Sequence, residues 1–217
     1  MKILVYTANF NNYDQIQYPV LDEASTDYLY FIDSSQKNRI WNFQNVQWKK
    51  IHSDPKRAVN YYKVGMHDLP DHDISLWVDS SMKFKSQISE LINKFIDSNA
   101  DLSICRHRWR DCVYDEGTAI LKRKLDSPKI VNSQLQRYRK LEFPKNFGLL
   151  ETTFILRKNN INTQLFNKLW YHEYLIGSRR DQLSVMYAFK NVPLKFMELP
   201  FKVDKNPYFA KIKHIKK

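Results

Sequence analysis

Cysteines and long apolar segments are scarce in this sequence. The 217 residues include two cysteines, Cys105 and Cys112, and neither has the Cys or His spacing of a structural zinc site. We therefore expect two reduced thiols and no disulfide framework. No run approaches the roughly 18 apolar residues that span a bilayer, and the apolar start at residues 1–6 is too short for a signal-peptide core. These absences predict a cytoplasmic protein.

Acidic residues are also in the minority. The chain carries 35 Lys and Arg against 23 Asp and Glu, a net charge of +12. Such an excess calls for an anionic partner, and nucleic acid, nucleotide phosphates and anionic lipid all qualify, although a solvated basic face would account for part of it. Residues 201–217 are predicted to form a basic C-terminal tail that contacts an anionic membrane surface reversibly. The charge is concentrated in residues 106–110, 122–124, 137–140 and 202–217.

Strand and helix patterns alternate along the chain, without an internal repeat or a linker. The length and the 43% hydrophobic content suit a single domain, and the alternation predicts an α/β fold with largely parallel strands. The strands are expected at residues 2–7, 28–33, 46–51, 74–78, 100–105, 147–157 and 193–200. Helices are expected at residues 53–67, 87–97, 162–176 and 181–189, with two more inside 114–141.

The predicted strand at residues 74–78 ends in an acid, and we expect it at the centre of the sheet. Asp79 follows it directly, beside Ser80 and Ser81. In open α/β sheets the carboxyl ends of the strands line the ligand crevice, so these side chains are candidates for binding a metal, a phosphate or a sugar. Alternatively, they could simply cap the next turn, as Asp and Ser often do.

Five motifs occur in a defined order: residues 6–13, Tyr62-Lys63 with His67, Trp77 with Asp79, residues 107–116, and residues 180–184. Together they resemble the TOD1/MUCI70 glycosyltransferase-like family, which is found in plants and in bacterial surface-polysaccharide gene clusters. Residues 57–82 also resemble the nucleotide-sugar-binding segment of GT-A glycosyltransferases, in which a helix leads through Leu-Pro to a strand ending in Asp-x-Asp. The resemblance covers about residues 1–200.

The resemblance implies one GT-A-like (Rossmann-like) α/β domain, a mixed sheet flanked by helices, over residues 1–200. Its expected activity is transfer of a sugar from a nucleotide donor, UDP-linked, to a glycan or lipid-linked acceptor in surface polysaccharide assembly. Because the diphosphate leaving group gains negative charge, cations must face it. The residues implied to bind the nucleotide sugar are Thr7, Asn9, Arg57, Lys63, Asp79, Ser81, His107, Arg110, Arg180 and Gln182.

Several of these residues have an ordinary structural alternative. Arg57 and Lys63 could be surface residues of an amphipathic helix. His107 and Arg110, with Asp115 and Glu116, could form a salt-bridge network on a loop.

Two acids are candidates for catalysis. Asp181 opens a predicted helix, where the resemblance implies that it deprotonates the acceptor or orients the sugar; alternatively, it only interacts favourably with the helix dipole. Glu151 lies inside an otherwise strand-like run and is expected to reach acceptor or donor hydroxyls, since acids are seldom buried without a partner.

A divalent cation is the expected cofactor of such a fold. Asp79 takes the first position of Asp-x-Asp, whose carboxylates hold Mg²⁺ or Mn²⁺. The third position is Ser81, and one carboxylate with a hydroxyl makes a poorer site for a hard cation. His214 is a further candidate ligand, with a solvated histidine as the alternative.

Two other functions stay open. A nucleic-acid-binding protein would fit the positive charge and the 14% aromatic content, but the familiar DNA- and RNA-binding motifs are missing, so nucleic acid is not the partner we expect. A non-catalytic nucleotide-binding protein that lost its metal site at Ser81 is the other alternative.

Overall fold

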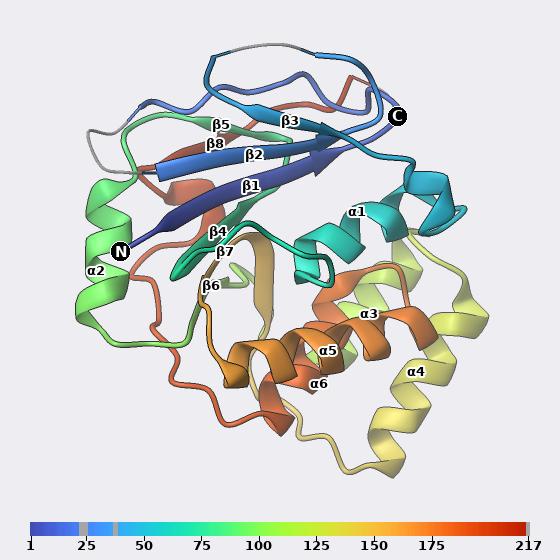
Figure 1. Ribbon diagram of the computed structural model, residues 1–217. Helices are drawn as coiled ribbons and strands as arrows, with labels where there is room; N and C mark the ends of the chain where they lie inside the picture. Colours follow the sequence, from blue (N-terminus) through green and yellow to red (C-terminus); the bar gives the residue numbers. More distant parts are fainter. Residues whose placement is uncertain (22–25, 37–38, 216–217) are drawn as a thin grey trace.

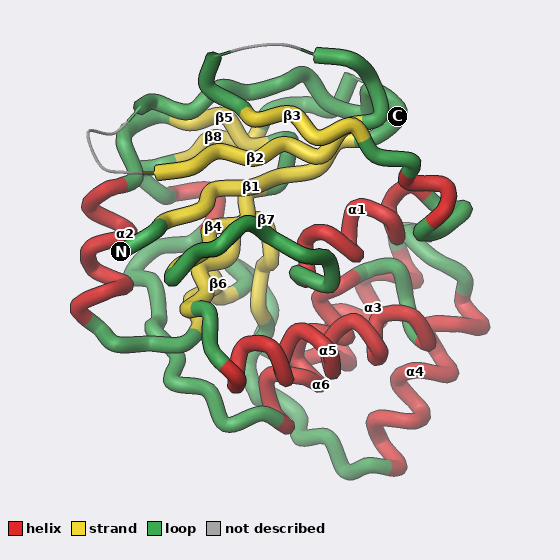
Figure 2. Tube along the Cα trace, in the orientation of Figure 1, coloured by secondary structure: helices red, strands yellow, loops and turns green. Residues whose placement is uncertain are grey.

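The computed structural model describes residues 1–21, 26–36 and 39–215 and is built on a six-stranded mixed sheet (Figure 1, Figure 2). The strand order is β3-β2-β1-β4-β7-β6. The pairs β1–β2, β2–β3 and β1–β4 are parallel, whereas β7 runs antiparallel to both of its neighbours. The strands are β1 (Ile3–Asn9), β2 (Thr26–Ile32), β3 (Asn42–Asn45), β4 (Ile74–Val78), β6 (Leu102–Arg106) and β7 (Leu150–Lys158).

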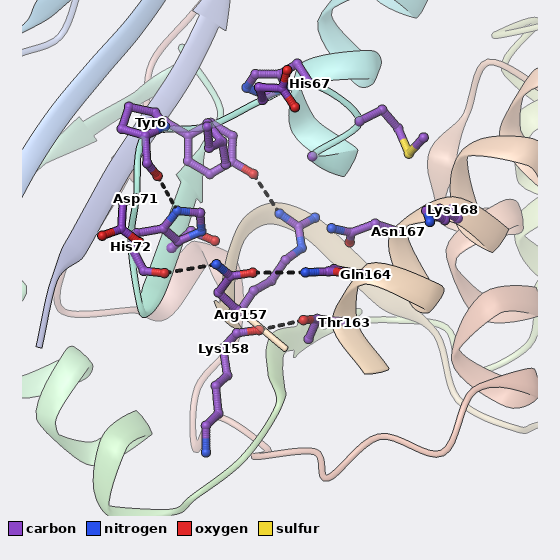
Figure 3. A pocket seen from close by; sticks show the side chains of 17 residues that line it. Tyr6, His67, Asp71, His72, Arg157, Lys158, Thr163, Gln164, Asn167 and Lys168 are labelled. Atoms are coloured by element: carbon purple, nitrogen blue, oxygen red, sulfur yellow. Dashed lines mark hydrogen bonds between the residues drawn. The ribbon is translucent and has the colours of Figure 1, made fainter. Parts of the chain in front are cut away.

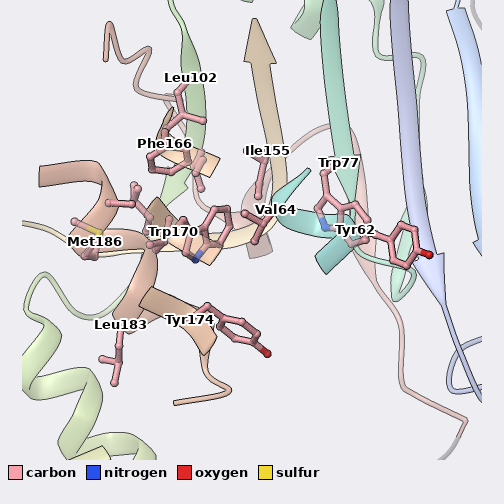
Figure 4. Packing of buried hydrophobic residues seen from close by; sticks show 14 of the residues in the cluster. Tyr62, Val64, Trp77, Leu102, Ile155, Phe166, Trp170, Tyr174, Leu183 and Met186 are labelled. Carbon is pink, nitrogen blue, oxygen red and sulfur yellow. The ribbon is translucent and has the colours of Figure 1, made fainter. Parts of the chain in front are cut away.

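Helices cover both faces of this sheet. Side chains alternate between the faces along a strand, so Tyr6 of β1 enters one core cluster and Val5 enters the other. The helices of the first face pack Trp170 and Met186 into the same cluster as Ile155 of the sheet, and Figure 4 shows Trp170 between Met186 and Ile155. That face carries α1 (Pro55–Val64), α3 (Val113–Lys122), α4 (Pro128–Lys140), α5 (Ile161–Ile176) and α6 (Asp181–Asn191), and the other carries α2 (Ser89–Asp97).

The start of α1 follows its sequence signals. The Asp54 side chain accepts a hydrogen bond from the backbone N–H of Lys56 at 2.8 Å, and Pro55 takes the first helical position, where no N–H is needed. The helix ends at Val64 rather than at residue 67, because Gly65 adopts a left-handed conformation with φ of 79°. This chain reversal leads directly into the loop before β4.

Two predicted strands are wrong. Residues 46–51 contain the 3₁₀ helix η1 (Trp48–Lys50), in which Trp48 is buried and its Nε1 donates to Asp33 at 2.8 Å, while β3 lies earlier, at Asn42–Asn45. Residues 193–200 form only an isolated bridge between Phe196 and Leu102. Prolines at both ends of that segment lack the N–H groups that a longer ladder would need. The expectation of largely parallel strands also fails at β7.

The segment after residue 200 packs on the rest of the chain. Following the 3₁₀ helix η2 (Val203–Lys205), β8 (Phe209–Lys211) pairs antiparallel with β5 (Met82–Phe84), and Tyr208 and Phe209 are buried. The last two residues of the predicted tail, 216–217, lie outside the described residues. Within the described ranges, no helix has both the length and the apolar character to cross a bilayer.

Candidate functional site

A lysine bridges two carboxylates where β4 ends. Lys63, in the last turn of α1, places its ammonium 3.1 Å from Oδ1 of Asp79 and 2.9 Å from Oδ2 of Asp181. The three side chains are 7%, 31% and 10% exposed, respectively. Trp77 Nε1 donates to the same Asp79 oxygen at 2.8 Å, and Thr152 Oγ1 donates to Asp181 at 2.9 Å. The strand end, the helix end and the start of α6 therefore meet in one charged centre.

The two carboxylates differ as acids. Burial raises the pKa of Asp181, but the Lys63 charge and hydrogen bond outweigh it and hold that pKa at about 2. For Asp79 the effect of burial exceeds the effect of the same ammonium, and the pKa of Asp79 is raised. Burial works against the charge of Lys63, yet Asp181 and Asp79 together raise the pKa of the ammonium. Lys63 is thus charged at neutral pH, and Asp181 is the stronger acid of the pair.

Further cations gather beside this centre. Lys56 precedes Lys63 by seven residues on α1, a spacing of two turns that puts both lysines on one face of the helix. Burial and then the charge of Arg180 lower the pKa of Lys56 to about 8, although Asp181 opposes the shift. The Nε of Arg180 is buried without a hydrogen-bond partner in the described part of the chain. Cations held close together in this way favour binding of an anion.

Sequence reasoning missed Lys56. The seven-residue spacing from Lys63 could have revealed it, because a helix that presents one lysine to a ligand presents the residue two turns away on the same face. Arg180 was predicted, and the structure brings it to this cluster.

A second polar group lies at the end of β1. The Asn9 amide and the Asp14 backbone bond to each other, at 2.7 Å and 3.2 Å. One oxygen of Asp14 accepts a hydrogen bond from Ser80 Oγ at 2.5 Å, and the other is 2.6 Å from Nδ1 of His214. The ring of Tyr13 lies against His214, with 4.6 Å between centroids. The C-terminal segment is therefore joined to the loops after β1 and β4 through Asp14, a residue that sequence reasoning missed.

Thr7 and Ser81 lie under these loops. The Thr7 hydroxyl is buried without a partner among the described residues, and with Asp79 and Ser80 it lines a cavity of about 10 Å³, which is room for about one water. Ser81 is buried, and its carbonyl accepts a hydrogen bond from the Ile212 N–H at 2.8 Å.

Arg57 belongs to a different contact. Its guanidinium donates to the carbonyl oxygens of Tyr174 and Gly177, each at 2.9 Å, where α5 ends. Carbonyl groups at a helix C-terminus lack partners within the helix, so Arg57 satisfies them. Arg57 is partly buried in this contact and is not a freely exposed surface residue, and its binding to the donor stays a prediction.

The loop after β6 contains the predicted network of mixed charges. Arg110 Nε forms a 2.5 Å ion pair with Glu116, and Nδ1 of His107 accepts the Arg110 backbone N–H at 3.1 Å. Burial, together with Arg110, lowers the pKa of His107 to about 4. These contacts match the salt-bridge alternative. Asp115 is exposed in the first turn of α3.

Glu151 and Gln182 have buried side-chain oxygens that lack partners. Oε2 of Glu151 and Oε1 of Gln182 find no hydrogen bond within the described ranges. Burial raises the pKa of Glu151, although Arg108 and Lys211 oppose that shift. Glu151 precedes Thr152 on β7, so its side chain points to the opposite face of the strand from the one that bonds Asp181, and Arg108 and Lys211 are the cations beside it. A half-buried acid with a raised pKa is a candidate for proton transfer.

Comparison with known proteins assigns the chain to a family. The family model described as "TOD1/MUCI70, glycosyltransferase-like domain" matches residues 1–212. The chain belongs to this family. "Probable hexosyltransferase MUCI70" of Arabidopsis thaliana is 28% identical over an alignment of 163 residues, and the match covers 70% of this chain and only 28% of that protein.

The solved structure of S. aureus TarS supports the fold. The crystal structure of S. aureus TarS 1-349 has a TM-score of 0.50 and 14% identity, and the match covers 97% of this chain and 60% of that one. Mouse xyloside xylosyltransferase 1 in its apo form has a TM-score of 0.48 and 11% identity, with 92% and 85% covered. The predicted GT-A-like α/β fold with a mixed sheet is confirmed.

A divalent cation does not fit the charged centre of this TOD1/MUCI70 family member as a site built by protein side chains. Hard cations take six or more oxygen ligands, whereas one oxygen of Asp79 already contacts the Lys63 ammonium and the Trp77 N–H. His214 is paired with Asp14. Across the described residues, no three His, Cys, Asp or Glu side chains converge as ligands.

Proposed function

We propose that this chain is a glycosyltransferase that moves a sugar from a UDP-linked donor to a glycan or lipid-linked acceptor in surface polysaccharide biosynthesis. The observation that carries the proposal is the cation cluster: Lys56 lies two turns before Lys63 on α1, and Arg180 directly precedes Asp181, which the Lys63 ammonium contacts. Family membership supports the same reaction class. An incoming diphosphate would relieve the repulsion among these cations.

In this proposal the cations stabilise the leaving group. As the sugar–phosphate bond breaks, negative charge grows on the diphosphate, and positioned positive groups in a partly buried site lower the barrier. Lys56 and Arg180 form no ion pair with a carboxylate among the described residues, so their charge is available to the diphosphate. Lys63 is held by two carboxylates, so it serves chiefly to fix their positions.

The two predicted catalytic acids receive different roles. A general base works best with a pKa near the operating pH. Asp181, with a pKa of about 2, is a weak base and is better suited to holding Lys63 and orienting the donor. Glu151 has a raised pKa and a buried oxygen without a partner in the described chain. We assign the deprotonation of the acceptor hydroxyl to Glu151.

The setting of the reaction belongs to the same proposal. The net charge of +12 supports transient contact with an anionic membrane that carries the acceptor, on the cytoplasmic side. Mn²⁺ or Mg²⁺ could enter with the donor's diphosphate, which supplies the oxygens that the protein lacks. None of the roles proposed for the side chains of the site requires the metal.

Thermal unfolding with a panel of nucleotide sugars tests the proposal, comparing wild type with Lys56→Met. A donor at a hundredfold excess over its dissociation constant stabilises a protein by about 2.7 kcal/mol. We expect a UDP-sugar to give this effect in wild type and a much smaller one in Lys56→Met. Lys122→Met, which removes an exposed lysine of α3, is the matched control and keeps the full shift. Stabilisation by short oligonucleotides alone would favour the nucleic-acid-binding alternative.

A further inference from the structure

A second cavity lies at the opposite end of β4 from the charged centre. It has a volume of about 550 Å³, within the range of ligand sites. Its walls come from the loop between α1 and β4, the start of β4, the end of β7 and the first turns of α5 (Figure 3). Ser75 lines the cavity whereas Asp79 follows the far end of the strand, so the two sites are separated by roughly 13 Å of strand.

A buried arginine lines this cavity. Arg157 of β7 is only 3% exposed. Its Nη1 donates to the Tyr6 hydroxyl and its Nη2 to the Lys63 carbonyl, each at 2.9 Å, and no carboxylate in the described ranges pairs with it. An arginine has five N–H donors, and its Nε is among those that lack a partner in the described chain. Burying a charge without a counter-ion is costly, so a ligand that supplies the missing negative charge would stabilise this arrangement.

The surroundings of Arg157 narrow the class of ligand. The Asn167 Oδ1 on α5 is buried without a partner among the described residues, and Lys168 is exposed beside the cavity. Lys158 turns outward to Asn99 at 3.0 Å. Asp68 and Asp71 also line the cavity, and Asp71 pairs with Lys2. Their charges disfavour a polyanion, while a single oxyanion group matches the planar guanidinium.

We propose that this cavity binds a small organic anion through Arg157, with a carboxylate or phosphate group against the guanidinium and a body that fills part of the 550 Å³. The two hydrogen bonds that fix Arg157 leave it preorganised, so little conformational entropy is lost on binding. The site shares no side chain with the charged centre, although Arg157 donates to the backbone carbonyl of Lys63.

Titration of the intact chain with inorganic phosphate and with acetate, at constant ionic strength, tests the proposal by amide NMR. We expect saturable shifts at millimolar concentrations for the Gly65, Met66 and Ser75 amides that border the cavity. A response to phosphate alone identifies a phosphate ligand, and a response to acetate identifies a carboxylate ligand. Absence of saturable shifts at these amides with both anions, or shifts confined to Arg180 and its neighbours, would overturn the proposal.

Variants separate the cavity from general anion binding. Arg157→Met should weaken the cavity response by about tenfold or more, which is about 1.4 kcal/mol. Because loss of a buried residue can prevent folding, Asn167→Asp is a second variant on the cavity wall, and the negative charge that it adds should weaken the response as well. Arg123→Met, at an exposed arginine after α3, is the matched control and should bind as wild type does. Equal affinity in wild type and a folded Arg157→Met would refute the role of the guanidinium.

Discussion

Replacing Lys63 with methionine is the sharpest test of the charged centre. The Lys63 side chain is 7% exposed, and its ammonium lies within 3.1 Å of both carboxylates. Removing one partner of a buried ion pair costs about 3–5 kcal/mol, because the remaining charge stays buried. Here two carboxylates lose their partner together. We therefore expect Lys63→Met to lower the free energy of unfolding at pH 7 by about 3 kcal/mol or more.

The difference in stability between wild type and Lys63→Met should depend on pH. The pKa of Asp181 is lowered from 3.8 to about 2, which corresponds to about 2 kcal/mol of stabilisation present above pH 4 and lost as the pH falls toward 2. Without Lys63 the buried carboxylates have raised pKa values, and the variant gains relative stability on acidification. The gap between wild type and Lys63→Met should therefore be smaller at pH 4 than at pH 7.

Urea denaturation at the two pH values measures this gap. Lys122→Met, an exposed lysine on α3, should change stability by no more than about 0.5 kcal/mol. The double variant Lys63→Met/Asp181→Asn should recover part of the loss, since one stranded charge is removed. A Lys63→Met protein within about 1 kcal/mol of wild type at pH 7, or an equal gap at pH 4, would refute the reasoning.

Four further outcomes follow from the same contacts. With a pKa of about 8 for Lys56, UDP affinity measured by calorimetry should fall about tenfold between pH 7 and pH 9 as the ammonium deprotonates, and Lys56→Met should flatten this profile. Glu151→Gln should lower kcat by about 10²–10⁴ with little change in donor affinity; an unchanged kcat excludes it as the base. Arg57→Met should destabilise the fold by about 1–3 kcal/mol and leave UDP binding intact, whereas a selective loss of binding would contradict the helix-capping role. UDP binding measured by calorimetry should persist in EDTA. Binding that depends completely on Mn²⁺ would refute the idea that lysines neutralise the diphosphate.

Local sequence signals predicted the parts of the site that each element sets by itself. The apolar run 74–78 placed Asp79 at a strand end, Asp54 and Pro55 placed the start of α1, and Asp181 does open a helix. Each of these features depends on a few neighbouring residues. Their roles in chemistry stay predictions.

The features that the sequence did not predict depend on contacts between residues far apart in the chain. The strand at Leu150–Lys158 mixes apolar and polar residues and is buried over most of its length, and such a pattern carries no information on whether it pairs parallel or antiparallel. At three residues each, β5 and β8 are too short to show alternation. Whether Arg57 meets a ligand or the end of α5 depends on a partner 117 residues away. The contact between Asp14 and His214 joins residues 200 apart.

Helix α1 positions both lysines of the site, Lys56 and Lys63, and its packing explains how. Tyr62 and Val64 of α1 are buried in the core between the sheet and the helices of its first face. Arg57 ties the same helix to the end of α5. The rotation of α1 about its axis is thereby fixed from two sides, and Lys56 and Lys63 are held on the face that borders β4 and α6. Cations fixed by the core need little rearrangement when charge develops on a leaving group, which is the condition under which electrostatic stabilisation is most effective.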